Sequence, residues 1–351
     1  MRTTIDEAKL EAFMGQVVTD LAAAESSVAC YVGDRLGLYR QLAGAGWVTA
    51  AELAAATGTN ERLVLEWLRN QTAGGYVDYD GERFSLPPEQ AAALADSGSA
   101  VFVGGVFEII ASMWADAEAF EAAFRGDGGL SWGAHDARLY DGVDRLFAPV
   151  YRSSLVSTWL PALDGVVERL QAGGRVADVG CGFGSSTIVM AEAFPAADIV
   201  GYDMHGPSLD AARLRAKEAG LDDRPRFELL DAVDLPAEGY DLVCFFDCLH
   251  DMGDPVSAAA GARRALAPDG VVMVVEPRAG DQLGDNVNPV GRLFYAGSTF
   301  LCTPSALAQE GGHALGAQAG PAAITEVLHT AGFRQVRVAA ETPFNLVIEA
   351  R

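Results

Sequence analysis

Near the middle of the chain an acidic residue precedes three closely spaced glycines. Asp178 is followed at alternate positions by Gly180, Gly182 and Gly184, after a short apolar run and before the segment 185–194, whose apolar residues have helical spacing. This order predicts a buried strand, a tight turn and a helix. Glycine lets the backbone pass close under a ligand, with φ values that a side chain would forbid. The segment therefore predicts a ligand-binding turn.

The glycine spacing argues against a dinucleotide ligand. The third glycine comes one position earlier than in the Gly-x-Gly-x-x-Gly pyrophosphate turn, and Asp178 would repel a phosphate. A nucleoside with a cationic part fits better. S-adenosylmethionine, a ribonucleoside with a sulfonium and an ammonium group, has this chemistry. We expect Cys181, inside the turn, to line the same site.

Three later apolar segments, at 199–203, 226–231 and 240–246, are predicted to be further strands. Parallel strands of an open α/β sheet bind ligands at their carboxyl ends, so residues at the ends of these segments should meet at one edge. Asp203 is placed to hold ribose hydroxyls, and Asp231 to accept from an adenine amino group. The residues expected around the ligand at these ends are Asp203, Met204, Asp231, Ala232, Phe246 and Asp247.

His250 and Asp251 follow the third of these segments, beside the expected position of a reacting methyl group. A phenol or enol attacks a methyl group better after losing its proton, and imidazole titrates near neutral pH. His250 is thus a candidate general base, with a structural histidine as the alternative. Asp251 could orient the imidazole or cap the next helix. A metal held by both residues and His313 is a further interpretation, but no third ligand lies at a recognisable spacing, so we expect none.

Candidate substrate-binding residues lie outside the predicted strands. The loop 128–135 carries an aromatic ring and an imidazole, and loops held by a scaffold often carry recognition groups. Residues 280–320 form a long insertion, which is typical of a lid or a binding segment. Within it, Asn288 and Thr303 each precede a proline, which predicts the N-caps of two short helices. The candidates are Trp132, His135, Tyr151, Arg292 and Tyr295.

The first 95 residues predict a separate winged-helix-like domain. Thr49 and Glu52 form a capping box, a helix is expected over 61–69, and Asp80-Gly81 predicts a hairpin after it. Such a domain could read DNA or could serve dimerisation. Residues 1–90 hold seven basic against thirteen acidic residues, which disfavours phosphate contacts and favours dimerisation. We expect a helical linker and substrate-pocket segment at 96–172 and the main α/β domain at 173–351.

Composition narrows the class of protein further. The net charge of −23 disfavours nucleic acid and anionic membranes as partners. Half of the residues are hydrophobic, which is enough to form buried cores. The five cysteines are scattered without a Cys-x-x-Cys pair, so neither a disulfide framework nor a zinc site is indicated. No apolar run approaches the about 20 residues of a membrane span, and the N-terminus lacks a signal-peptide core. We expect a cytoplasmic protein.

The motifs together resemble those of class I S-adenosylmethionine-dependent methyltransferases, over about 174–277. The winged-helix layout is similar to that of plant-type small-molecule O-methyltransferases, in which a His-Asp pair supplies the base; here Met252 stands where they have tryptophan. Across its length the chain resembles a bacterial two-domain group, by the runs 247–255, 286–292 and 316–320. The resemblance implies a Rossmann-like α/β sheet, mostly parallel with an antiparallel terminal strand, bound S-adenosylmethionine and a homodimer formed through the N-terminal domain.

The resulting hypothesis is a methyltransferase acting on a small aromatic, phenolic or enolic acceptor, with O-methylation assisted by His250. A C-methyltransferase, in which a metal could assist, is one alternative. An S-adenosylmethionine-binding transcriptional regulator without methyl transfer is a second, and a rearrangement on the same fold is a third. The sequence does not identify the acceptor.

Overall fold

A computed structural model describes residues 5–126, 128–221 and 224–351. The chain forms two compact units. The first contains the chain up to Ser112 together with Asp141–Pro149, and the second contains Met113–Tyr140 and Val150–Arg351. The segment 96–172, which we expected to be a linker, is therefore shared between the two units. None of the helices in the described ranges combines the length and the apolar character needed to cross a membrane.

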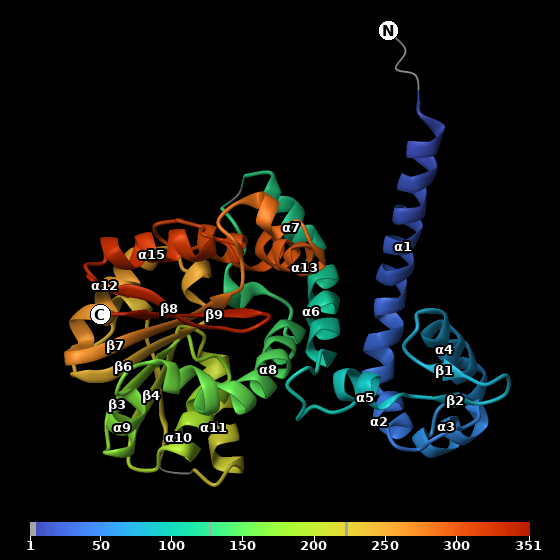
Figure 1. Ribbon diagram of the computed structural model, residues 1–351, viewed down its shortest axis with the longest axis horizontal. Helices are drawn as coiled ribbons and strands as arrows, with labels where there is room; N and C mark the ends of the chain where they lie inside the picture. The colour runs from blue at the N-terminus through green and yellow to red at the C-terminus, as the bar shows by residue number, and fades with distance from the viewer. Residues whose placement is uncertain (1–4, 127, 222–223) are drawn as a thin grey trace. The chain divides into compact units, whose positions relative to one another are not determined.

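The first unit is a winged helix preceded by a long helix (Figure 1). Thr49 and Glu52 make the predicted capping box, and Asp78 pairs with Ser85 in the predicted antiparallel hairpin. The core of the unit includes Leu42, Trp67 and Leu68. The elements are α1 (Glu7–Arg35), α2 (Leu38–Leu42), α3 (Ala50–Thr57), α4 (Glu61–Ala73), β1 (Asp78–Tyr79), β2 (Phe84–Ser85), α5 (Pro88–Leu94), α6 (Gly104–Ala115) and most of α8 (Arg138–Val150).

Helix α1 contacts the rest of this unit through its C-terminal third. The Trp67 indole donates to the carbonyl of Ala29 at 2.8 Å, and the Asn70 amide donates to Ser26 at 3.0 Å. Large apolar side chains also form a solvent-exposed stripe along α1, because residues three and four apart share one helix face. The exposed members of the stripe are Leu10, Phe13, Met14, Val18, Leu21, Val28 and Val32.

The second unit is built on a central sheet with the order β5-β4-β3-β6-β7-β9-β8. The pairs from β5 to β7 are parallel, whereas β9 is antiparallel to both of its neighbours, which confirms the predicted sheet. Its strands are β3 (Arg175–Val179), β4 (Asp198–Asp203), β5 (Arg226–Leu229), β6 (Tyr240–Phe246), β7 (Leu266–Pro277), β8 (Val336–Glu341) and β9 (Asn345–Ala350). The strands β3 and β6 are almost wholly buried, as expected for parallel strands covered on both faces.

Helices cover both faces of this sheet (Figure 1). One face carries α9 (Val166–Gln171), α10 (Ser185–Ala193) and α11 (Gly206–Glu218), and the other carries α12 (Pro255–Ala265) and α15 (Gly320–Thr330). Small residues of α12 and branched residues of α15 pack on the central strands in one large core. Because β3, β4, β5 and β6 are parallel, their carboxyl ends lie together at one edge of the sheet.

The insertion between β7 and α15 differs in part from the sequence prediction. Asn288 caps α13 (Pro289–Gly297) as expected, accepting from the amide of Gly291 at 2.9 Å. Thr303 is not a cap: its φ of −63° and ψ of −46° are helical, and α13 runs without a break into η7 (Ser298–Cys302) and α14 (Thr303–Leu307). The segment η7 is a π-helical turn. Pro304, the second residue of α14, has no amide hydrogen to donate and lies directly after this π turn.

Candidate functional site

Asp178, at the end of β3, is a carboxylate with no solvent exposure. Its Oδ2 accepts hydrogen bonds from the hydroxyls of Ser186 and Thr187, both at 2.6 Å, at the start of α10. Its Oδ1 has no hydrogen-bond partner among the described residues. Burial raises the pKa of Asp178 to about 6, although the two hydroxyls oppose the shift. A carboxylate buried in this way favours a cationic or hydrogen-bond-donating ligand.

The three glycines of the turn all have left-handed φ values of +53° to +76°. A Cβ on Gly180 would lie 2.8 Å from the sulfur of Cys248, and one on Gly184 would lie 2.7 Å from the ring of Phe227. These two glycines are thus required by packing. A Cβ on Gly182 would meet no atom within 4 Å, so Gly182 faces open space. It is the one position of the turn where a side chain would occupy room available to a ligand.

Asp203, at the end of β4, is hydrogen-bonded to the glycine turn that follows β3. Its Oδ2 accepts from the amide of Gly182 at 2.8 Å, and its Oδ1 accepts from the amide of His205 at 2.7 Å. Burial raises the pKa of Asp203, while these backbone donors lower it. Cys181 is buried beside this contact, whereas Met204 is mostly exposed. The structure therefore brings Asp178, the glycine turn and Asp203 together at one strand edge.

The ends of β5 and β6 complete the same edge. Asp231 is exposed and its Oδ1 accepts from the amide of Val233 at 3.1 Å, so part of its hydrogen-bonding capacity is used locally. Ala232 follows it in η4 (Ala232–Asp234). Asp247, after β6, has an unusual left-handed φ of 49° and accepts from the Asn345 amide at 3.2 Å. Burial first, and Glu276 second, raise its pKa well above the ordinary aspartate range.

His250 lies in η5 (Leu249–Asp251) and is buried. Its Nδ1 makes a short hydrogen bond with Oε2 of Glu276, a buried residue near the end of β7. Its Nε2 lies 3.2 Å from the sulfur of Cys302, at the end of η7. Burial opposes a charge on the imidazole, but Glu276 and Cys302 outweigh it and hold the pKa of His250 well above its usual value. The site thus contains a carboxylate, an imidazole and a thiol in series.

Neither function considered for Asp251 matches these contacts. The carboxylate that binds the His250 ring is Glu276, and the cap of α12 is Asp254, which accepts from the amide of Ser257 at 2.8 Å. Burial raises the pKa of Asp251 to about 7, with His250 acting in the opposite direction. Asp251 therefore lies close to the imidazole without bonding to it.

Glu276 was missed because a single glutamate at a strand end has no distinctive spacing. The available signal was the apolar run at 270–275, which is followed directly by Glu276. Cys302 gave no signal of its own. Within the described residues no group of three histidine, cysteine, aspartate or glutamate side chains is arranged to hold a metal ion.

The proposed substrate-binding residues are placed in different surroundings. The His135 side chain is fully buried, with Nδ1 3.0 Å from Oδ2 of Asp116, and burial lowers its pKa. Trp132 is half-buried, and its carbonyl accepts from the hydroxyl of Tyr140 at 2.8 Å. The Tyr140 ring lies 4.6 Å from the ring of His205, two residues beyond Asp203. This packing brings the 132–135 loop close to the end of β4, but His135 itself points into a packed aromatic cluster.

Tyr151 is buried, with its ring 5.3 Å from that of Phe246 at the end of β6. Trp159 stacks on the same phenylalanine at 6.3 Å. The three rings form an apolar wall behind the β6 end of the site. Arg292 is exposed on α13, and Tyr295 is half-buried on the same helix.

Family models match both units of the chain. Residues 170–315 match the model described as "Methyltransferase domain", and residues 24–96 match the "Rv2258c-like winged HTH domain". The chain therefore contains a methyltransferase domain and an Rv2258c-like winged helix-turn-helix domain. This combination confirms the resemblance to two-domain methyltransferases with a winged-helix N-terminal domain.

Curated relatives match part of the chain. A 27-O-demethylrifamycin SV methyltransferase of Amycolatopsis mediterranei is 33% identical over 131 residues, which cover 35% of this chain and 48% of the relative. A ubiquinone biosynthesis O-methyltransferase of Actinobacillus pleuropneumoniae is 36% identical over 105 residues, covering 28% and 44%. The chain thus spans less than half the length of these relatives.

Solved structures match nearly the whole chain at the level of fold. The mitomycin 7-O-methyltransferase MmcR superposes with a TM-score of 0.70 at 21% identity, covering 99% of this chain and 100% of that chain. Human N-acetylserotonin methyltransferase, solved with S-adenosylmethionine, superposes with a TM-score of 0.66 at 18% identity, covering 100% and 99%. The two-unit architecture is therefore that of these methyltransferases.

Proposed function

We propose that this chain is an S-adenosylmethionine-dependent methyltransferase that methylates an oxygen of a small aromatic, phenolic or enolic acceptor. The observation that carries the proposal is the glycine turn between Asp178 and Asp203, in which Gly182 alone faces open space. The names of the matched proteins support it, since the rifamycin, ubiquinone and mitomycin enzymes are all described as methyltransferases of small molecules.

The residues at the strand edge fit this cofactor. Asp178 has a buried Oδ1 without a partner, which suits a cationic amino acid portion. Asp203 would accept from the ribose hydroxyls and Asp231 from the adenine, and Gly182 would leave room for the methionine portion. S-adenosylmethionine supplies an electrophilic methyl group on a sulfonium, and the protein binds it, excludes water and orients the acceptor.

His250 is our candidate for the base that removes the acceptor's proton. Glu276 holds Nδ1, so Nε2 is the nitrogen left for proton transfer, and it faces Cys302. An acceptor hydroxyl bound here would replace the thiol as the partner of Nε2. Glu276 would stabilise the imidazolium that forms, as carboxylates do beside catalytic histidines. In this scheme Glu276 is the residue that positions the ring, and Asp251 makes no bond to it.

The experiment that tests this function combines binding with turnover. Calorimetry should detect S-adenosylmethionine binding to the full chain, and incubation with phenolic, keto-acid and polyketide-like acceptors should release S-adenosylhomocysteine with one class. Binding without release on any acceptor would favour a sensor or a rearrangement enzyme, and absence of binding would remove the proposal. Methylation of carbon in the product would replace the O-methylation assignment.

We also propose that two chains associate through the apolar stripe of α1. The stripe contains large side chains such as Phe13, Val18 and Leu21, each about 60% exposed in the single chain. An unpaired apolar face of this kind marks an interaction site, and a second copy would bury it symmetrically.

For the winged-helix unit we propose a function in assembly rather than in DNA recognition. On α4, the helix expected to enter a DNA groove, Arg62 and Arg69 both pair with Glu66, at 2.5 and 2.7 Å. This arrangement leaves little positive charge for phosphates. A gel shift with a random duplex at moderate salt should show no complex.

A further inference from the structure

Cys302 differs from the other four cysteines in its partner. Cys248 donates to the carbonyl of Val179 at 3.2 Å, Cys30 faces the amide oxygen of Gln71 at 3.8 Å, and Cys181 and Cys244 are buried. Burial raises the pKa of all four thiols. Cys302 is only half-buried, and its sulfur lies 3.2 Å from Nε2 of a histidine. A thiol next to an imidazole is the usual arrangement of a reactive cysteine.

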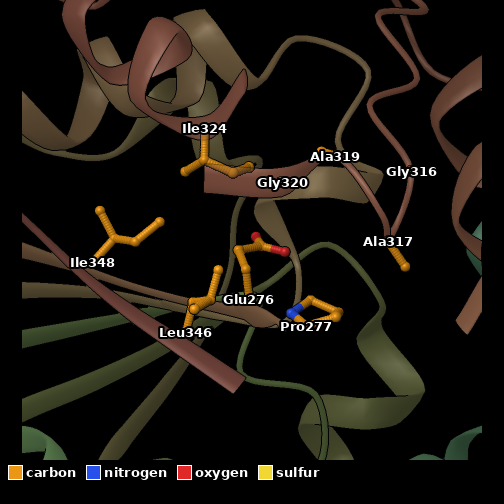
Figure 2. A pocket seen from close by; sticks show the side chains of 9 residues that line it. All are labelled: Glu276, Pro277, Gly316, Ala317, Ala319, Gly320, Ile324, Leu346 and Ile348. Atoms are coloured by element: carbon orange, nitrogen blue, oxygen red, sulfur yellow. The ribbon is translucent and has the colours of Figure 1, made fainter. Parts of the chain in front are cut away.

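The imidazole beside Cys302 is itself oriented by a carboxylate. Glu276 bonds to Nδ1 through Oε2, and its Oε1 has no hydrogen-bond partner among the described residues. Figure 2 shows the Glu276 carboxylate at a small cavity lined by Pro277, Leu346 and the turn 316–320. Sulfur, imidazole and carboxylate therefore stand in the order nucleophile, base and orienting group.

The backbone around Cys302 fixes this geometry. In the π-helical turn η7 the amide of Thr303 donates to the carbonyl of Ser298, five residues back. The hydroxyl of Ser298 accepts from the amide of Ala317 at 3.1 Å, and the amide of Gly316 donates to the carbonyl of His250 at 3.1 Å. The thiol and the imidazole are thus held by the same loop. Single π turns inside helices are frequent at functional sites.

Charges around the imidazole favour a proton on the ring. His250 contacts Glu276 and Cys302 directly, and Asp247 and Asp251 lie in the same acidic surroundings. A protonated imidazole beside a sulfur stabilises its thiolate form, which is the nucleophile. The Glu276 carboxylate bonded to the ring disfavours anionic reagents, so small uncharged electrophiles should be preferred.

We propose that Cys302 is a covalent modification site, a nucleophilic thiol activated by His250 and Glu276 that reacts with small uncharged electrophiles. With iodoacetamide as the probe, the sulfur attacks the carbon that carries iodine. A carbon–sulfur bond forms, the carbon–iodine bond breaks, iodide leaves, and the thiol proton stays on His250. A group added to Cys302 would also fill the space in front of Nε2. Modification would then stop methyl transfer, a consequence that rests on the function proposed above.

The test measures the alkylation rate of each cysteine in the folded full chain at pH 7, by peptide mass spectrometry. Cys248 is the matched control, because it is also half-buried and lies at the same site without a base as partner. Cys302 should react about tenfold faster than Cys248 or more. The variant His250→Gln should slow Cys302 by about tenfold while Cys248 keeps its rate. Equal rates for the two cysteines, or an unchanged Cys302 rate in the variant, would overturn the proposal.

Two measurements on the unsubstituted protein decide the matter if the variant does not fold. At pH 7 Cys302 should react about tenfold faster in the folded chain than in the urea-unfolded chain, where the imidazole no longer lies beside the sulfur. Iodoacetate, the anionic analogue, should be disfavoured relative to iodoacetamide more strongly at Cys302 than in the unfolded chain. A rate in the folded chain no higher than in the unfolded chain, or no difference in reagent preference, would refute the activated thiol.

Activity provides a separate measurement. Release of S-adenosylhomocysteine should fall in step with alkylation of Cys302, and the activity of Cys302→Ala, whatever its level, should resist iodoacetamide. If alkylated protein remains fully active, the consequence for methyl transfer is wrong although the thiol is reactive. If the chain releases no S-adenosylhomocysteine at all, the alkylation rates still decide the proposal about Cys302.

Discussion

At the scale of single residues, His250 is held by Glu276 on one side and faces Cys302 on the other. We expect His250→Ala to lower turnover by about 10²–10⁴-fold, the usual contribution of a positioned base, with S-adenosylmethionine affinity nearly unchanged. The comparison is His329→Ala, which removes an exposed histidine on α15. Full activity of the His250 variant on the true acceptor would assign His250 a structural function.

The pH dependence of turnover follows from the raised pKa of His250. The imidazole must be neutral to accept a proton, and Glu276 and Cys302 outweigh the effect of burial and hold its pKa well above the usual value. The rate should therefore rise with pH beyond the ordinary histidine range and then level off. A rate already level at pH 6.5 would contradict this protonation state.

Asp178 gives a prediction about stability. Its pKa is about 6 in the folded protein, above the ordinary 3.8, so the folded state binds its proton more tightly than the unfolded state. Stability should therefore be lost as pH rises from about 4 through 6, by on the order of 3 kcal/mol, and be regained when a cation binds. Asp178→Asn should show a smaller difference in melting temperature between pH 5 and pH 7.5 than the parent, because Asp251, with its pKa of about 7, still titrates in this range. The variant should also bind S-adenosylmethionine weakly.

The control for this measurement is Asp231→Asn, an exposed acid at the neighbouring strand end. This variant also removes one carboxylate from a chain of net charge −23, but it keeps Asp178. Its melting temperature should therefore differ between the two pH values as much as that of the parent. If both variants behave alike without ligand, the buried carboxylate is not the source of the pH dependence.

At the scale of elements, the glycine turn between β3 and α10 contains two glycines that packing requires and one, Gly182, that faces open space. We expect Gly182→Val to abolish S-adenosylmethionine binding, because its side chain would occupy the open space above the turn. Gly182 also has a left-handed φ of +53°, so the substitution costs stability of about 1–2 kcal/mol. Loss of binding must therefore be distinguished from loss of fold.

Gly165→Val is the matched variant for that purpose. Gly165 lies in the same unit, has a φ of +72°, and also has no atom within 4 Å of a built Cβ. Both variants should lose similar melting temperature, but only the Gly182 variant should lose binding in calorimetry. Binding retained by Gly182→Val would place the ligand elsewhere.

At the scale of the whole molecule, the α1 stripe predicts the oligomeric state. Phe13→Glu combined with Leu21→Glu places charges on the exposed apolar face and should give a monomer by light scattering. Thr19→Glu, on the opposite face of α1, should leave the assembly intact. A double variant that remains a dimer would remove α1 from the interface, and a parent that is a monomer would remove the dimer itself.

The sequence alone was enough to predict a winged helix followed by an α/β domain with a mostly parallel sheet. The alternation of apolar residues and the capping signals at Thr49 and Asn288 act within a few residues, so local rules describe them. The acids Asp178 and Asp203 were predictable because parallel strands bring their carboxyl ends to one edge regardless of the details of packing. The continuous helix through Thr303 was not, because its preceding π turn is stabilised by contacts with the distant residues 316–317.

The chemistry beside the proposed methyl-transfer site depends on contacts between distant segments. Glu276 and Cys302 lie 26 and 52 residues from His250 in the chain, and nothing in their spacing relates them. The same holds for Asn345, which holds Asp247 from 98 residues away. The periodicity of apolar residues indicates which face of a helix or strand is buried. The hydrogen bonds and burial of a polar side chain depend instead on which other elements pack against that side chain. The sequence therefore predicted a cofactor site at this strand edge, whereas the partners of His250 follow only from the packing of β7 and η7 against it.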